Sequence, residues 1–266
     1  MSVAVIISVY FNDQVSHFEQ AVSSIPTDVE GEPVHIYLHV DGALKPDLNA
    51  AIDRFKFYKI LRSSSNVGLA AGLNKLIASL EDEWLVYRMD SDDINLSNRF
   101  KDQYDFMMSN PDVDILGGGI VEFVGGLDNV VFKKNYPEND GDIRSKIFKS
   151  SPFAHVTVCF RRRFFHRVGL YPVEYALNED IAYWFKALRC KVVMANLPAY
   201  CVGVRMDGAY ARRGYKKSFN ELRVFFRGCL ENRVLPVYPV LRFIFRLMPA
   251  SFSRVLYRSR VRHLLS

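Results

Sequence analysis

Short apolar runs alternate with helical spacing along the first third of the chain. The runs are four to seven residues long and rich in β-branched side chains, as in strands that are buried on both faces of a parallel sheet. They cover residues 3–9, 34–40, 58–61 and 84–89. Helices are predicted between them at residues 14–24, 48–55 and 67–80. This order predicts an α/β domain with a mostly parallel, Rossmann-like sheet flanked by helices.

The pattern becomes less regular beyond residue 111. Helices are predicted at residues 96–108 and 143–148, and strands at residues 115–124, 130–132 and 155–160. We interpret residues 1–110 and 111–215 as two halves of one domain. Residues 216–266 form a predicted helical tail.

Polar side chains follow the predicted strands at the points where they end. These residues are Asn12 with Asp13, Asp41, Asn66, and the run from Asp90 to Asp93. The carboxyl ends of parallel strands meet at one edge of a sheet, where α/β proteins bind their ligands. The sequence therefore predicts a polar crevice at this edge.

Two carboxylate pairs carry the candidate chemistry. Asp90-Ser91-Asp92 follows a buried strand, and its oxygens suit Mg²⁺ or Mn²⁺ bound together with a diphosphate. The alternative is a helix cap, with Asp93 before the helix at 96–108. The second pair, Glu179-Asp180, follows Asn178 and opens a helix that carries Ile181, Trp184, Phe185 and Leu188 on its apolar side. Capping is again the alternative.

The net charge of +6 resides in the tail. Residues 223–266 hold nine Arg and one acidic residue, which leaves 26 basic and 28 acidic residues in the rest of the chain. A basic tail on an acidic domain, without a nucleic-acid motif, argues against nucleic-acid binding. The four cysteines show neither a metal-binding nor a disulfide pattern.

The tail has the pattern of a helix that lies on a membrane surface. In Val240–Leu247, Arg242 and Arg246 lie on one helix face, where they can reach anionic headgroups, while Phe243, Ile244 and Leu247 enter the acyl boundary. Packing on the catalytic domain is the alternative. Prolines and arginines interrupt the apolar stretch, so no transmembrane helix is expected, and no signal peptide is apparent. We therefore expect a cytoplasmic protein that is peripheral on the inner face of the cell membrane.

Taken in order, the motifs resemble those of the family-two glycosyltransferases of GT-A fold, including bacterial enzymes of O-antigen and other surface polysaccharides. The resemblance covers about residues 3–207 and rests on the following sequences: Val9-Tyr10 with Asn12, Val40-Asp41-Gly42, Asn66-Val67-Gly68-Leu69 leading to Asn74, Met89-Asp90-Ser91-Asp92-Asp93, Phe153-Ala154-His155 before Arg161-Arg162, and Glu179-Asp180. It implies a nucleotide-sugar half at 1–110 and an acceptor half at 111–215.

The resemblance also implies roles for individual residues on the donor side. Asp41 would pair with uracil, and Tyr10 and Asn12 would line the nucleoside pocket. Asp90 would face the ribose or the metal, and Asp92 would bind the metal directly. Asn66 and Gly68 would approach the nucleotide, although a capped helix with a small residue for close packing explains them equally well.

On the acceptor side the resemblance makes Asp180 the base and Glu179 an acceptor-binding or orienting neighbour. His155 contacts the acceptor or donor in this interpretation, or else is a structural residue. Arg205 would lie with Tyr210, Arg212 and Arg213 in a flexible loop that closes over the diphosphate, unless this run is only a solvated charged loop.

The implied reaction is inverting transfer of a single hexose, galactose or glucose, from a UDP-sugar. The acceptor would be a polyprenyl-diphosphate-linked saccharide of O-antigen or lipopolysaccharide biosynthesis, and an α-linked donor would give a β-linkage. Neither tryptophan follows an Arg, unlike the Gln-x-x-Arg-Trp motif of processive synthases. The alternatives are a sugar-phosphate nucleotidyltransferase, which would need a Gly-rich loop after the first strand, and a non-catalytic sugar-binding or scaffold protein of this fold.

Overall fold

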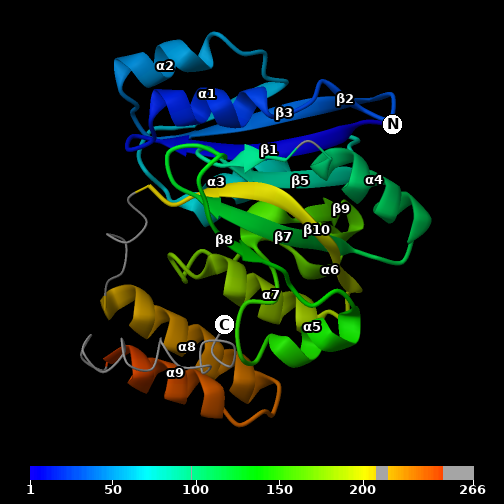
Figure 1. The fold of residues 1–266 in the computed structure, drawn as a ribbon, viewed down its shortest axis with the longest axis vertical. Helices are drawn as coiled ribbons and strands as arrows, with labels where there is room; N and C mark the ends of the chain where they lie inside the picture. Colours follow the sequence, from blue (N-terminus) through cyan, green and yellow to red (C-terminus); the bar gives the residue numbers. More distant parts are fainter. Residues whose placement is uncertain (97, 208–214, 248–266) are drawn as a thin grey trace.

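One mixed sheet of ten strands forms the centre of the molecule, with helices on both of its faces (Figure 1). The computed structural model describes residues 1–96, 98–207 and 215–247. The strands are β1 Val3–Tyr10, β2 Asp28–Val29, β3 Glu32–Asp41, β4 Lys59–Ser63, β5 Leu85–Asp90, β6 Ile94–Asn95, β7 Ile115–Phe123, β8 Val130–Lys134, β9 Cys159–Arg161 and β10 Met194–Arg205. The helices are α1 Val15–Ser23, α2 Pro46–Ile52, α3 Leu69–Ala78, α4 Arg99–Ser109, α5 Asp140–Lys146, α6 Arg163–Val168, α7 Glu179–Arg189, α8 Tyr215–Glu231 and α9 Val237–Leu247.

Strands β4, β3, β1 and β5 are parallel neighbours, as the alternation of strands and helices predicts. The register aligns Tyr10 with Asp41, and Asp41 with Ser63. Asp90 pairs with Ser8, two residues before the end of β1. The predicted gathering of polar residues at one sheet edge is therefore present.

The second half of the sheet is less regular. Strand β9 runs antiparallel between β5 and β7. The prediction of a strand at residues 155–160 is wrong at its start, because His155–Thr157 is a 3-10 turn. The Thr157 hydroxyl bonds the carbonyls of Ala154 and Gly118, and such local side-chain bonds compete with strand pairing.

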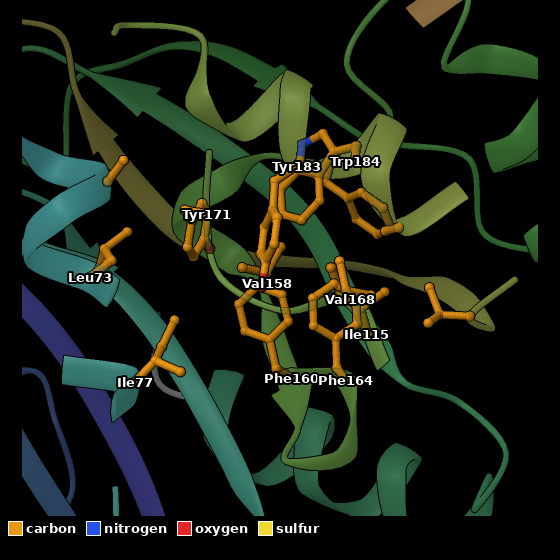
Figure 2. Packing of buried hydrophobic residues seen from close by; sticks show 14 of the residues in the cluster. Leu73, Ile77, Ile115, Val158, Phe160, Phe164, Val168, Tyr171, Tyr183 and Trp184 are labelled. Atoms are coloured by element: carbon orange, nitrogen blue, oxygen red, sulfur yellow. The ribbon is translucent and has the colours of Figure 1, made fainter. Parts of the chain in front are cut away.

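Side chains of β5 alternate between the two faces of the sheet. Leu85, Tyr87 and Met89 belong to the apolar cluster that includes residues of α4. Val86 belongs to the opposite cluster, where α3 and α7 pack, and Figure 2 shows its aromatic centre around Phe160, Tyr183 and Trp184. Because side chains two residues apart share a face, Arg88 and Asp90 also point to the side of α3 and α7.

The two last described helices differ in how they are packed. Val224, Phe225 and Cys229 of α8 are buried, and Gly228 lets the helix approach the ring of Phe185 on α7. Helix α8 thus forms part of the core.

Helix α9 packs against α8 and exposes a row of apolar side chains. The row comprises Val237, Tyr238, Val240, Leu241 and Ile244, which are 37–56% exposed. None of the helices in the described ranges is long and apolar enough to cross a membrane. The basic residues Arg254, Arg258, Arg260 and Arg262 lie outside the described residues.

Candidate active site

The turn after β5 brings three carboxylates together. Ligand oxygens of Asp90, Asp92 and Asp93 lie within 4.8 Å of one another. Burial raises the pKa of Asp93 well above its ordinary value, and the charges of Asp90 and Asp92 raise it further. A hard divalent cation would relieve this repulsion, and an all-oxygen donor set fits such an ion. We call residues 90–93 the metal turn.

The capping alternative for the metal turn is wrong. Helix α4 begins only at Arg99, and its N-terminal cap is Asn98. The Asp93 carboxylate instead accepts the backbone N–H of Arg205 at 2.9 Å.

Arg205 holds the metal turn through hydrogen bonds to Asp92 and Asp93. It is the last residue of β10 and is 6% exposed, so the prediction that it lies in a flexible loop is wrong. Its guanidinium donates to the carbonyls of Asp92 at 3.1 Å and Gly125 at 3.0 Å, and to the Gln20 side chain at 2.7 Å. Tyr210, Arg212 and Arg213 lie outside the described residues.

Asp13 is a site residue that the sequence placed in the crevice without assigning it a role. Its carboxylate accepts the Ser91 hydroxyl at 2.6 Å and the Tyr10 N–H at 3.1 Å, so it joins the end of β1 to the metal turn. Burial raises its pKa to about 6; the two hydrogen bonds oppose this shift and the charges of Asp92 and Asp90 add to it.

The residues predicted to bind the nucleotide lie at the ends of β1, β3 and β4 or directly after them. Asp41 accepts the N–H groups of Val67 at 2.7 Å and Gly68 at 3.0 Å. Each carboxylate oxygen can accept a second bond, so an N–H of a base can still be received. Tyr10 is 39% exposed, and Asn12 and Asn66, which are predicted to bind the same nucleotide, are exposed as well.

Gly68 is required by its backbone conformation. Its φ is +85°, and a Cβ at this position would meet nothing within 4 Å, so close packing does not explain it. The cap of α3 is Gly68 itself, without a side-chain hydrogen bond, so Asn66 does not cap this helix.

The second carboxylate pair opens α7. Asn178 precedes the helix without making a side-chain cap bond. Burial raises the pKa of Glu179, and the charge of Asp180 raises it further, whereas Arg88 lowers it. Asp180 is less buried than Glu179, and its charge also acts on the hydroxyls of Tyr136 and Tyr171.

Arg88 lies between the two carboxylate pairs, and the sequence analysis did not identify it. Its Nη2 donates to Asp90 at 2.5 Å, and the residue is 1% exposed. The Nε and Nη1 atoms are buried and have no hydrogen-bond partner among the described residues. Its charge acts on both Asp93 and Glu179. A buried guanidinium with unfilled donors is costly, which makes a purely structural role a poor explanation.

His155 is half-buried and contacts aromatic side chains of the core. Its Nε2 is 3.0 Å from the Tyr171 hydroxyl, and its ring lies edge-on to Trp184. Burial lowers its pKa well below the ordinary value, and the charge of Arg88 lowers it further. These contacts favour the structural interpretation of this residue.

Comparisons with known proteins agree with this geometry. The model of the family described as glycosyl transferase family 2 matches residues 4–169. The UDP-Gal:alpha-D-GlcNAc-diphosphoundecaprenol beta-1,3-galactosyltransferase of Escherichia coli is 31% identical over 273 residues, which cover 98% of this chain and 97% of the relative. An uncharacterized glycosyltransferase of Haemophilus influenzae is 29% identical and covers 98% of this chain and all of its own.

A third relative and a solved structure extend the comparison. The amylovoran biosynthesis glycosyltransferase AmsE of Erwinia amylovora is 29% identical, over 96% of this chain and 97% of the relative. The crystal structure of S. aureus TarS 1-349 in complex with UDP-GlcNAc matches 95% of this chain and 73% of its own, with a TM-score of 0.63 and 17% identity. At this identity the match shows a shared fold.

Proposed function

The chain belongs to glycosyl transferase family 2 and has a GT-A fold, and from this we propose that it transfers a single hexose from a UDP-sugar with inversion. The observation that carries the proposal is the arrangement of two carboxylate pairs, the metal turn and Glu179-Asp180, on the same side of β5 around Arg88. Family membership also argues against the nucleotidyltransferase and scaffold alternatives.

On the donor side, Asp90 and Asp92 would hold Mn²⁺ or Mg²⁺. The cation would supply positive charge for the diphosphate leaving group. Asp41, with Tyr10 and Asn12, would receive the uracil and its ribose, and the N–H-rich loop around Asn66 and Gly68 would approach the nucleotide. Binding of UDP-GlcNAc by TarS, which has the same fold, supports a UDP-sugar donor.

On the acceptor side, Asp180 would take the proton of the attacking hydroxyl. That oxygen forms a bond to the anomeric carbon while the bond from this carbon to the diphosphate oxygen breaks on the opposite face. One displacement inverts the configuration, so an α-linked donor gives a β-linked product. Glu179 would orient the acceptor, and the raised pKa of its carboxyl suits a side chain that can donate a hydrogen bond.

The acceptor would be a lipid-linked saccharide in the synthesis of a surface polysaccharide, such as O-antigen. The E. coli relative acts on GlcNAc-diphosphoundecaprenol, and AmsE belongs to amylovoran biosynthesis. The galactose of the E. coli donor makes UDP-galactose the first candidate here, followed by UDP-glucose.

A peripheral position on the inner face of the membrane follows from this acceptor and from α9. The exposed row of Val237, Tyr238, Val240, Leu241 and Ile244 would enter the interface. Arg242, by contrast, pairs with Glu221 at 3.2 Å and faces the domain, contrary to the prediction that it reaches headgroups.

The test measures UDP release and product formation from UDP-galactose and UDP-glucose with a GlcNAc-diphosphate-lipid and Mn²⁺. We expect acceptor-dependent release that falls by about 10²–10⁴-fold in Asp180→Asn. Asp92→Asn should lose donor binding together with activity, and Asp112→Asn, exposed at the opposite end of the sheet, serves as the control. Wild-type protein that binds no nucleotide sugar would refute the proposal.

A further inference from the structure

Four basic residues from β8, from α5 and the residues after it, and from α9 lie near one another. Lys134 ends β8, Lys146 ends α5, Lys149 follows α5, and Arg242 belongs to α9. We call these residues the basic cluster. The three lysines are close in the sequence, but Arg242 lies about a hundred residues farther along the chain, so its proximity to them is a product of the fold.

Lys134 is the centre of the basic cluster. Its ammonium lies 4.9 Å from the ring centre of Tyr136, and within the described ranges it has no salt bridge or hydrogen bond. Burial lowers its pKa below the ordinary value, and the positive charges of Arg242 and Lys146 lower it further, while Glu122 opposes them. Like charges are thus held together around a half-buried cation. A bound anion would relieve their repulsion.

Helix α9 closes the basic cluster from one side. Arg242 Nη2 lies 3.2 Å from Glu221, and Nη1 lies 3.5 Å from the Lys149 carbonyl. The Lys149 ammonium lies 5.0 Å from the ring centre of Tyr238 on α9. The exposed apolar row of α9 therefore begins beside the basic cluster.

Tyr136 connects the basic cluster to the reaction centre. Burial raises the pKa of its hydroxyl, and the charges of Glu122 and Asp180 raise it further. The Lys134 ammonium lies over the face of the Tyr136 ring. A molecule that presents a hydroxyl to Asp180 would pass Tyr136 on its way to the cations, whereas the donor diphosphate would lie at the metal turn.

We propose that the basic cluster binds the diphosphate of the lipid-linked acceptor, with the sugar at Asp180 and the lipid leaving along α9. The proposal rests on the acceptor class of the proposed function. A diphosphate offers several charged oxygens, which the lysine ammonium groups can bind as point charges. In this proposal the parts of the acceptor follow the same order as the groups that would bind them. The hydroxyl would lie at Asp180, the sugar at Tyr136, the diphosphate at the basic cluster and the lipid along the apolar row.

The test compares two acceptors, α-linked GlcNAc-diphosphate-decyl and the decyl glycoside without the diphosphate, in neutral micelles. Lys134→Gln and Lys146→Gln should raise the KM for the diphosphate acceptor about tenfold, as expected for a lost charge-assisted contact. The KM for the neutral acceptor and for the UDP-sugar should not change. Lys134→Arg should keep the KM for the diphosphate acceptor close to the wild-type value. Arg54→Gln, which changes an exposed arginine between α2 and β4, is the control.

Equal KM changes for both acceptors would overturn the proposal. So would an effect seen only on vesicles that contain phosphatidylglycerol, because the basic cluster would then bind headgroups. Calorimetry with decyl diphosphate in metal-free buffer gives a second measurement: wild type should bind it and Lys134→Gln should bind about tenfold more weakly. Calorimetry separates the proposed function from the proposed diphosphate site. A wild-type protein that transfers no sugar would refute the function, and its binding of decyl diphosphate would still test the basic cluster.

Discussion

The metal turn and the proposed acceptor side are built differently. The metal turn is joined to other elements by hydrogen bonds, from Arg205 to the Asp92 carbonyl and from Ser91 to Asp13. The acceptor side presents Lys134 over an aromatic ring and leaves α9 apolar and exposed. The metal turn thus uses its polar groups internally, whereas the proposed acceptor side leaves cationic and apolar groups open to a ligand.

Arg88 and Arg99 give the largest contrast, because both are 1% exposed but only Arg99 has filled bonds. Arg99 donates to Arg88 O, Asn95 and Gln103. Arg99→Met leaves these acceptors unpaired and should lower the free energy of unfolding by about 3–5 kcal/mol. Arg88→Met removes the partner of only one group, the partly exposed Asp90. The free energy of unfolding should therefore change by less than about 1 kcal/mol, while kcat falls about 10²-fold.

Denaturant unfolding and steady-state kinetics on the two variants check this contrast. If Arg88→Met proved as unstable as Arg99→Met, with normal kcat in its folded fraction, Arg88 would be a structural residue.

Asp13 should make stability depend on pH in the metal-free protein. Its folded pKa of about 6 lies above the ordinary 3.8, so the folded state binds the proton more tightly. Its contribution to stability is present below about pH 4 and is lost as the pH rises through about 6. Asp13→Asn should therefore gain stability over wild type across this range, by up to about 3 kcal/mol.

Chemical unfolding of wild type and Asp13→Asn at pH 4, 5, 6 and 7 measures the effect. Parallel stability curves would contradict it. Mn²⁺ should reduce the difference, because the cation offsets the charges of Asp90 and Asp92.

Arg205 should affect metal binding more than folding of the site as a whole. Arg205→Lys loses the fork that joins Asp92 O, Gly125 O and Gln20, so the metal turn becomes looser. We expect Mn²⁺ affinity to fall about 10–100-fold, as when a ligand loses its supporting contacts. Calorimetry with Mn²⁺ and UDP checks this, with Arg54→Lys as the control. Unchanged affinity would show that the backbone alone holds the turn.

The smallest expected effect concerns α9. Replacing Leu241 and Ile244 with Gln removes part of the exposed apolar row and should weaken binding to vesicles about tenfold, without changing kcat on a soluble acceptor. Val173→Gln, a similarly exposed residue before α7, should bind vesicles as wild type does. Sedimentation with vesicles measures both. Equal binding by all three proteins would remove the membrane proposal for α9.

The donor side was predictable from the sequence because its signals are local. Apolar runs end at Tyr10, Asp41 and Asp90, and parallel pairing brings strand ends together. Arg205 was misplaced because Pro198 and irregular pairing conceal the long strand β10 that ends with it.

The acceptor side was less predictable because its relations are tertiary. Arg88 interrupts an apolar strand by one residue, and only the packing of α7 reveals Glu179 beside it. The basic cluster depends on β8, α5 and α9 coming together, which no sequence spacing encodes. The roles of the individual site residues remain predictions.

Proton NMR of the product tests the central claim most directly. Wild-type protein is incubated with α-linked UDP-galactose or UDP-glucose, the GlcNAc-diphosphate acceptor and Mn²⁺, and the anomeric signal of the purified product is recorded. We expect one added hexose in β-linkage, because a single displacement between the metal turn and Asp180 inverts the anomeric carbon. An α-linked hexose would contradict this geometry.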